Sequence, residues 1–126
     1  MMTLLPVSRP QGVRLMRRWG LPDWVDPGAQ YVAYGDFCVF AVVQQPGFLD
    51  VHIAMEADHR HKCRTAGQAL LEVIGKHRLR ALIPTDKTFA RNFLTRMNFT
   101  GWSLEEVRLI DGSTTPAFVM WREPGR

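Results

Sequence analysis

The sequence predicts an α/β fold: a mixed, mostly antiparallel sheet of six or seven strands with helices on both faces. Three observations lead to this prediction. The length of 126 residues suits a single domain spanning 1–126. Strand-like runs rich in Val and Phe alternate with segments of helical periodicity. Near the middle, a strand, a helix and a strand follow one another, which predicts a right-handed crossover between two parallel strands.

The first half of the chain contains four of the predicted strands and one helix. Pro6 suits an edge strand because proline cannot donate to a neighbouring strand. Gly20 and the following Leu-Pro end the helix with residues that commonly stop helices. In the last of these strands apolar and polar residues alternate, so that Val51, Ile53 and Met55 share one face. The predicted strands are 3–7, 31–34, 37–43 and 48–55, and the predicted helix covers 13–19.

The second half contains two predicted helices and three predicted strands. Apolar residues from Ala66 to Ile74 recur at helical spacing, and the helix should end near His77. The last helix should be capped by Thr85 or Asp86. The remaining predicted elements are a strand at 80–83, a helix at 90–97, strands at 102–110 and 117–121, and a turn at 111–113.

Composition excludes some classes of function and leaves others open. The net charge of +4 fits an anionic ligand, nucleic acid or neither. Arg14, Arg17 and Arg18 form the polar side of the first helix without a nucleic-acid motif, so a solvated helix face is the expected interpretation. No apolar run is long enough to span a bilayer, and the start of the chain shows no secretion signal.

Cysteine and histidine usage points to a reducing compartment without a metal centre. Cys38 and Cys63 are too few for a disulfide scaffold, so a cytoplasmic location is expected. Asp58, His59, His61 and Cys63 are ligand types within six residues, but zinc sites usually take ligands from two separate elements. No metal is therefore expected.

Two stretches carry a resemblance to a known family. Residues 55–62 (MEADHRHK) lead into 67–72 (GQALLE), and residues 90–99 read ARNFLTRMNF. The first is similar to the fourth strand, pyrophosphate loop and following helix of the GNAT (Gcn5-related N-acetyltransferase) superfamily. The second is similar to that family's later helix, which typically reads Ala-x-x-Leu-Tyr-x-Lys-x-Gly-Phe. The likeness is good over 37–99 and topological elsewhere, and it implies a GNAT-like fold with a gap between two diverging strands.

The resemblance implies an acyl-CoA site, with acetyl-CoA as co-substrate. In the family the diphosphate lies at a helix N-terminus, beside a loop of the form Arg/Gln-x-x-Gly-x-Gly/Ala. Alignment on Gly67 puts Lys62 at the Arg/Gln position and Thr65 at the first glycine, whereas alignment on Arg60 makes the loop two residues longer. The glycines are absent, so side chains would hold the diphosphate. The expected cofactor-binding residues are Met55, Arg60, Lys62, Arg64, Thr65, Ala66 and Gly67.

An alternative interpretation of the same stretch needs no ligand. Thr65 and Gln68 have the spacing of a capping box, in which case the helix begins at Thr65. The basic residues before it would then lie in a solvated loop.

The chemistry of acyl transfer to an amine needs a base, and two side chains are candidates. Glu56 stands at the end of the stretch that resembles the family's fourth strand. His52 lies on the same strand, and the pKa of a free histidine is about 6.5. Either could instead be structural: Glu56 as a surface carboxylate, His52 as a half-buried histidine. Leu94 stands where the family typically has the Tyr that acts as the general acid. Asn98 replaces a typical Gly and could form a left-handed helix cap.

Two functions of different classes follow from this. The first is an acyl-CoA-dependent N-acyltransferase, with acetyl as the default group and an amine acceptor contacted by residues 14–28 and the last hairpin. The second is a non-catalytic protein on the same scaffold that binds a protein partner. Its small size is similar in style to GNAT-like proteins of tailed bacteriophages, some associated with virions or host takeover. A homodimer is possible in either case, and membrane or nucleic-acid partners are not expected.

Overall fold

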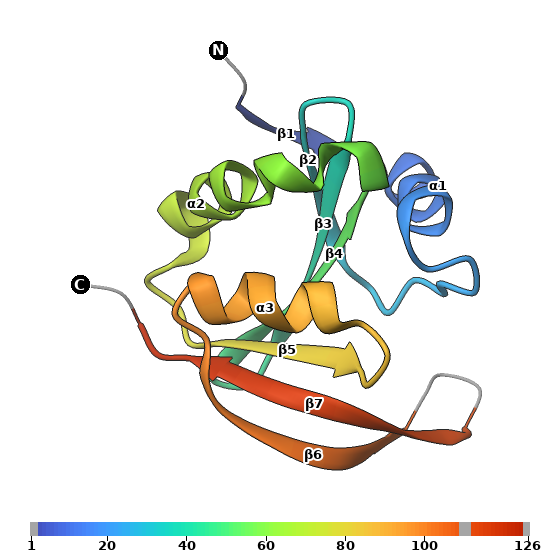
Figure 1. Ribbon diagram of the computed structural model, residues 1–126. Coiled ribbons are helices and arrows are strands. Elements are labelled where there is room, and N and C mark those ends of the chain that lie inside the picture. The colour runs from blue at the N-terminus through green and yellow to red at the C-terminus, as the bar shows by residue number, and fades with distance from the viewer. Residues whose placement is uncertain (1–2, 109–111, 125–126) are drawn as a thin grey trace.

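The computed structural model describes residues 3–108 and 112–124, which form a seven-stranded sheet covered by helices (Figure 1). The strands lie in the order β1-β2-β3-β4-β5-β7-β6. Every neighbouring pair is antiparallel except β4 and β5, which are parallel. The predicted mixed sheet with its central crossover is therefore confirmed. In chain order the elements are β1 (Leu4–Val7), α1 (Arg9–Trp19), β2 (Gln30–Tyr34), β3 (Cys38–Gln45), β4 (Phe48–Met55), the short 3₁₀ helix η1 (Ala57–Lys62), α2 (Cys63–Ile74), β5 (Leu79–Pro84), α3 (Thr88–Arg96), β6 (Thr100–Arg108) and β7 (Thr114–Arg122).

The helices cover opposite faces of the sheet. Helix α1 packs through Met16 against a cluster on β2, β3 and β4 that includes Tyr31 and Ala54. Helices α2 and α3 cover the other face, where Leu70 and Phe93 join the larger core cluster. The period-two pattern of β4 explains the division: its odd-numbered residues 51–55 pack in the larger cluster, whereas Ala54 packs under α1.

Helix α1 begins four residues earlier than predicted. The Ser8 hydroxyl accepts a hydrogen bond from the Gln11 N–H at 3.3 Å, and Pro10 occupies the first turn. The helix ends as predicted at Gly20, whose N–H donates to the Met16 carbonyl. A side chain at Gly12 would be impossible without rearrangement, because a Cβ there would lie 2.2 Å from the Tyr31 ring.

The predicted starts of the two later helices are wrong. Helix α2 begins at Cys63, directly after the 3₁₀ turns of η1, so Thr65 lies inside the helix and forms no capping box. The basic stretch is therefore helical and not a loop, but Arg60, His61 and Arg64 are exposed to solvent. Helix α3 begins at Thr88 with Lys87 at its cap position, and neither Thr85 nor Asp86 caps it.

The end of α3 follows the prediction made for Asn98. Its φ of 67° is left-handed, and the next residue, Phe99, donates its N–H to the Leu94 carbonyl at 3.0 Å. This wrapped end turns the chain directly into β6. Strand β6 begins at Thr100, before the predicted start, and the predicted turn at 111–113 lies partly outside the described residues.

Candidate functional site

The parallel strands β4 and β5 form a fork. They pair at only two positions, Leu49 with Leu79 and Asp50 with Arg80. Beyond that point β4 stays paired with β3 as far as Met55, and β5 stays paired with β7 as far as Pro84. The two strands therefore diverge (Figure 1), and the edges that face each other across the gap have no strand partner.

A cavity of about 400 Å³ occupies the fork. Residues 51–55 of β4 and 81–84 of β5 form its sides, and the ends of α1 and the buried faces of α2 and α3 also line it. Because α1 lies on one face of the sheet and α2 and α3 on the other, the cavity is reached by elements from both faces. Most of its lining is apolar. The charged and imidazole side chains among the lining residues are His52, Arg60, Asp86 and Lys87.

An ion pair closes the root of the fork. Arg80 donates from Nε and Nη2 to the two carboxylate oxygens of Asp50, at 2.6 and 2.8 Å. Gln45 donates to the same carboxylate at 3.1 Å, and Asp50 is only 4% exposed. The hydrogen bonds to Asp50 raise the pKa of Arg80, so the guanidinium keeps its charge. This pair ties the two strands together at the last position where they are in register.

His52 lies on β4, two residues beyond the root, and lines the cavity. Its ring meets the edge of the Trp24 indole, with the ring centroids 5.0 Å apart. Burial lowers the pKa of His52; Asp50 opposes this effect and the Arg80 charge adds to it. The imidazole is therefore neutral at neutral pH and can accept a proton.

Glu56, the other candidate base, lies just past the end of β4 and is not among the residues that line the cavity. Its backbone N–H donates to the Phe37 carbonyl at 2.8 Å. Its carboxylate oxygen lies 2.7 Å from the buried Nδ1 of His59. This contact lacks the geometry of a hydrogen bond, and Nδ1 has no other hydrogen-bond partner among the described residues. The His59 ring in turn stacks on Phe37. The carboxylate is thus directed toward η1.

The predicted basic residues lie on η1 and the first turn of α2. Arg60 lines the cavity, with its guanidinium 4.7 Å from the centre of the Phe89 ring of α3. The ammonium of Lys62 lies 5.2 Å from the centre of the Phe37 ring, and Arg64 is exposed. None of the three forms an ion pair with a carboxylate within residues 3–108 and 112–124. Their charges are therefore free to meet an anion.

The smaller predicted cofactor-binding residues have different surroundings. Ala66 and Gly67 are buried on the inner face of α2, and Thr65 is exposed. A Cβ at Gly67 would lie 2.7 Å from the Met97 sulfur and 2.8 Å from the Phe93 ring, so this glycine lets α2 approach α3. The Cys63 N–H donates to the Arg60 carbonyl. Met55 is buried and lines the cavity, as does Leu94, which the resemblance aligns with a Tyr.

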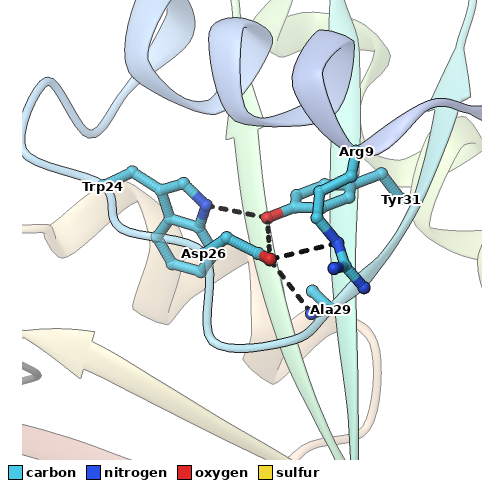
Figure 2. Close-up of polar contacts among 5 residues, drawn as sticks. All are labelled: Arg9, Trp24, Asp26, Ala29 and Tyr31. Atoms are coloured by element: carbon cyan, nitrogen blue, oxygen red, sulfur yellow. Dashed lines mark hydrogen bonds and ion pairs between the residues drawn. The ribbon is translucent and has the colours of Figure 1, made fainter.

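Sequence reasoning missed a hydrogen-bonded network that holds the loop between α1 and β2 (Figure 2). One carboxylate oxygen of Asp26 accepts from the Tyr31 hydroxyl at 2.6 Å and from the Ala29 N–H at 3.0 Å. The indole N–H of Trp24 donates to the same Tyr31 oxygen at 3.1 Å, and Arg9 lies 3.1 Å from the other oxygen of Asp26. The only available signal was an Asp between two aromatic residues in a turn-rich segment.

The network lowers the pKa of Asp26 and raises the pKa of Tyr31. The hydrogen bond from Tyr31 lowers the pKa of Asp26. Burial and the hydrogen bond to Asp26 raise the pKa of Tyr31 to about 12. Near neutral pH, Tyr31 is thus a neutral donor and Asp26 an ionised acceptor. Because the Trp24 indole donates to the same Tyr31 hydroxyl, this hydrogen-bonded chain holds Trp24 against His52.

The described residues offer few other reactive groups. Cys38 and Cys63 are free, buried thiols, and burial raises the pKa of Cys38. No group of three His, Cys, Asp or Glu side chains within the described ranges could hold a metal ion. None of the described helices is long and apolar enough to cross a membrane.

Comparison with known proteins finds likeness in structure and not in sequence. No family model matches the chain, and no curated protein matches it by sequence. A ribosomal-protein alanine N-acetyltransferase from Escherichia coli superimposes with a TM-score of 0.68 at 13% identity, over 100% of this chain and 96% of that one. A protein from Salmonella typhimurium assigned as an acetyltransferase and solved with its cofactor acetyl-CoA gives 0.67 at 12% identity, over 100% and 95%. A spermidine/spermine N-acetyltransferase from Vibrio cholerae gives 0.63 at 12% identity, over 97% and 94%. At these identities the likeness shows a shared fold.

Proposed function

We propose that this chain, which has the GNAT fold in a form of divergent sequence, is a single-domain N-acyltransferase that takes acetyl from acetyl-CoA to an amine. The observation that carries the proposal is the fork between β4 and β5, with its cavity bounded by elements from both faces of the sheet. Two substrates that react with each other can then enter from opposite faces and meet beside His52.

The acyl arm would lie along the free edge of β4. An extended chain can pair with unsatisfied backbone groups as an added strand does, and the fork leaves such groups at residues 51–55. The apolar sides of the cavity suit the pantetheine arm. Because β4 leads into η1, the diphosphate at the far end of the arm would reach the basic residues of η1 and α2.

Side chains would hold the diphosphate in place of a glycine-rich backbone. Arg60, Lys62 and Arg64 supply three cations without carboxylate partners among the described residues. The backbone offers less, because η1 is helical and the Cys63 N–H is already bonded. A charge-assisted hydrogen bond is worth about 1.5–3 kcal/mol, so two or three of them can replace the glycine loop.

His52 is our candidate for the base. Its neutral imidazole lies in the cavity, where it would take a proton from the amine as the nitrogen bonds to the thioester carbon. Breakage of the carbon–sulfur bond releases the CoA thiolate, which takes a proton from solvent because Leu94 has none to give. Glu56 remains a prediction as a base, and its carboxylate beside His59 supports a second role in holding η1.

A thermal-shift titration with acetyl-CoA tests the proposal. A ligand at about 100 times its dissociation constant adds roughly 2.7 kcal/mol, so the melting temperature should rise by several degrees. Desulfo-CoA should give a similar rise, since it keeps the diphosphate. His52→Gln should leave this shift in place but lower the rate of acetyl transfer at least ten-fold, and Glu56→Gln is the comparison variant. The absence of any shift at millimolar acetyl-CoA would contradict the proposal.

A non-catalytic role on the same scaffold is the second candidate. Leu94 is 6% exposed and lies in the core, so no proton donor takes the place of the family's Tyr there. The helical η1 likewise departs from an open glycine loop. On this reading the chain binds a protein partner, and a pull-down should retain the partner in the presence of excess acetyl-CoA.

A further inference from the structure

The part of the cavity lining that comes from the end of α1 is apolar and aromatic. Trp19, Gly20 and Leu21, at the end of α1, line the cavity directly. Trp24 is not among the lining residues but packs against one of them, His52, and we call Trp19, Leu21 and Trp24 the aromatic wall. The side chains of Trp19, Leu21 and Trp24 are partly buried, so each keeps surface that a bound group could cover.

One carboxylate lines the cavity among the described residues, and a second is buried at the root of the fork. Asp50 shares a face of β4 with His52, but both of its oxygens are bonded to Arg80. Among the described lining residues Asp86 is the one carboxylate, against the two cations Arg60 and Lys87. Glu105 acts electrostatically on Arg80 but is not among the residues that line the cavity. A second ammonium group lying against Trp19, Leu21 and Trp24 would lose its water there without gaining an ion pair from these three side chains.

The wall is also fixed in position. Trp24 is tied through Tyr31 to Asp26, and Arg17 donates to the Trp24 carbonyl at 2.9 Å. A contact surface that is already ordered loses little entropy when a ligand covers it. The aromatic wall is therefore suited to select among amines, and not merely to fill space.

We infer that the acceptor is a primary monoamine carried on an apolar or aromatic group, which packs against Trp19, Leu21 and Trp24 while its nitrogen lies beside His52. Trp24 is then the specificity-determining residue, and Tyr31 and Asp26 are positioning residues. This inference rests on the proposed function, to which it adds the acceptor class. Polyamines are expected to be poorer acceptors than monoamines of the same length.

Two amines of equal chain length provide the test. Hexylamine and hexamethylenediamine differ only in a second terminal ammonium, and phenethylamine adds an aromatic group. Acetyl transfer from acetyl-CoA should give a kcat/KM for hexylamine at least about ten-fold above that for the diamine, with phenethylamine higher still. A diamine that is as good an acceptor as hexylamine, or better, would overturn the inference.

A binding measurement separates this inference from the proposed function. In the protein without acetyl-CoA, phenethylamine should shift the indole N–H resonance of Trp24, and hexamethylenediamine at the same concentration should not. Failure of phenethylamine to move this signal would overturn the acceptor assignment even if acetyl-CoA binds. Failure of acetyl-CoA to bind while phenethylamine still moves the signal would overturn the transferase proposal and leave the amine site standing.

Substitutions show which side chains determine the KM for the amine. Trp24→Leu should raise KM for phenethylamine about ten-fold, whereas Trp102→Leu, at an exposed tryptophan of β6, should not change it. Tyr31→Phe should raise the same KM several-fold with acetyl-CoA affinity unchanged. Its matched control is Tyr34→Phe, because no hydrogen bond of the Tyr34 hydroxyl is found within the described residues. Equal KM values for Tyr31→Phe and Tyr34→Phe would remove Tyr31 and Asp26 from the account.

Discussion

The two ends of the cavity are built in opposite ways. On the α1 side, Asp26, Tyr31 and Trp24 are joined by hydrogen bonds of 2.6–3.1 Å, and each charge has a partner. On the α2 side, Arg60 and Lys62 lie over aromatic rings without a carboxylate partner among the described residues. The polar groups on the α1 side are thus paired with one another, whereas the cations on the α2 side are left to pair with a bound anion.

This difference indicates how the fold divides its tasks. Ordering a surface before binding favours selectivity, because a rigid wall rejects a group of the wrong shape or charge. Leaving cations unpaired favours affinity for an anion, because no existing ion pair must be broken first. The α1 side is therefore suited to choose an acceptor, and the α2 side to hold a common cofactor. The predictions below test each side separately.

The largest effect is expected at Gly12, where α1 meets the centre of the ordered network. Gly12→Ala would place a Cβ 2.2 Å from the Tyr31 ring, so the helix or the ring must move. We expect a loss of about 3 kcal/mol in the free energy of unfolding, measured by urea denaturation. Gly20→Ala is the control, because its Cβ would lie 3.4 Å from that of Ala54, and it should cost far less. Equal stabilities for the two variants would contradict the packing described here.

On the α2 side, Arg60→Ala should weaken acetyl-CoA binding without changing stability. Loss of one charge-assisted contact predicts about ten-fold weaker binding by calorimetry, a difference that should shrink at high salt. Arg18→Ala removes the same charge from the exposed face of α1 and should leave the dissociation constant unchanged. If both variants bind equally well, the diphosphate does not meet Arg60.

A smaller effect is expected from the titration of His52 at the meeting point of the two sides. Its lowered pKa means that the unfolded chain binds a proton more readily than the folded one. Stability is thus fully present above the unfolded pKa of about 6.5 and is lost as pH falls below it, by less than about 1.4 kcal/mol per pH unit. Asp50 and Arg80 are the charged groups that act on His52. Urea unfolding between pH 7 and pH 5 should show this slope in the wild type and in His77→Gln, and a reduced slope in His52→Gln.

The smallest effect is expected at Asn98, which is not among the residues that line the cavity. At its φ of 67°, glycine avoids a steric cost, so Asn98→Gly should be neutral or stabilise the protein by up to about 1 kcal/mol. Asn92→Gly, in the exposed middle of α3, should instead destabilise by about 1 kcal/mol. Melting temperatures of the two variants should therefore move apart, and a shift in the same direction would contradict the left-handed cap.

The order of helices and strands along the chain could be predicted, because it depends on local periodicity. The alternation in 48–55 gave β4 with its observed bounds, and the Asn in place of Gly gave the left-handed end of α3. The starts of α2 and α3 could not be predicted from capping residues, because no side chain caps either helix.

The candidate site was predictable only in its local part. Arg60 and Met55 both line the cavity, because Met55 ends β4 and Arg60 follows it closely in sequence, and their contact with a cofactor stays a prediction. The pair of Asp50 with Arg80 joins residues 30 positions apart, and no local pattern marks it. The contact of Trp24 with His52 likewise depends on how α1 and its loop pack on the sheet. Gly67, expected beside a phosphate, lines the cavity and also lies close to Phe93 and Met97, since glycine serves close packing as well as anion binding.

Hydrogen exchange along the fork tests the central claim most directly. Backbone amides of residues 51–55 and 81–83 that face the gap have no partner across it. If acetyl-CoA lies there as an added strand, some of these amides should become strongly protected on its addition, whereas amides of β2 should not change. Protection that appears only at η1, or nowhere, would contradict an acyl arm seated between β4 and β5.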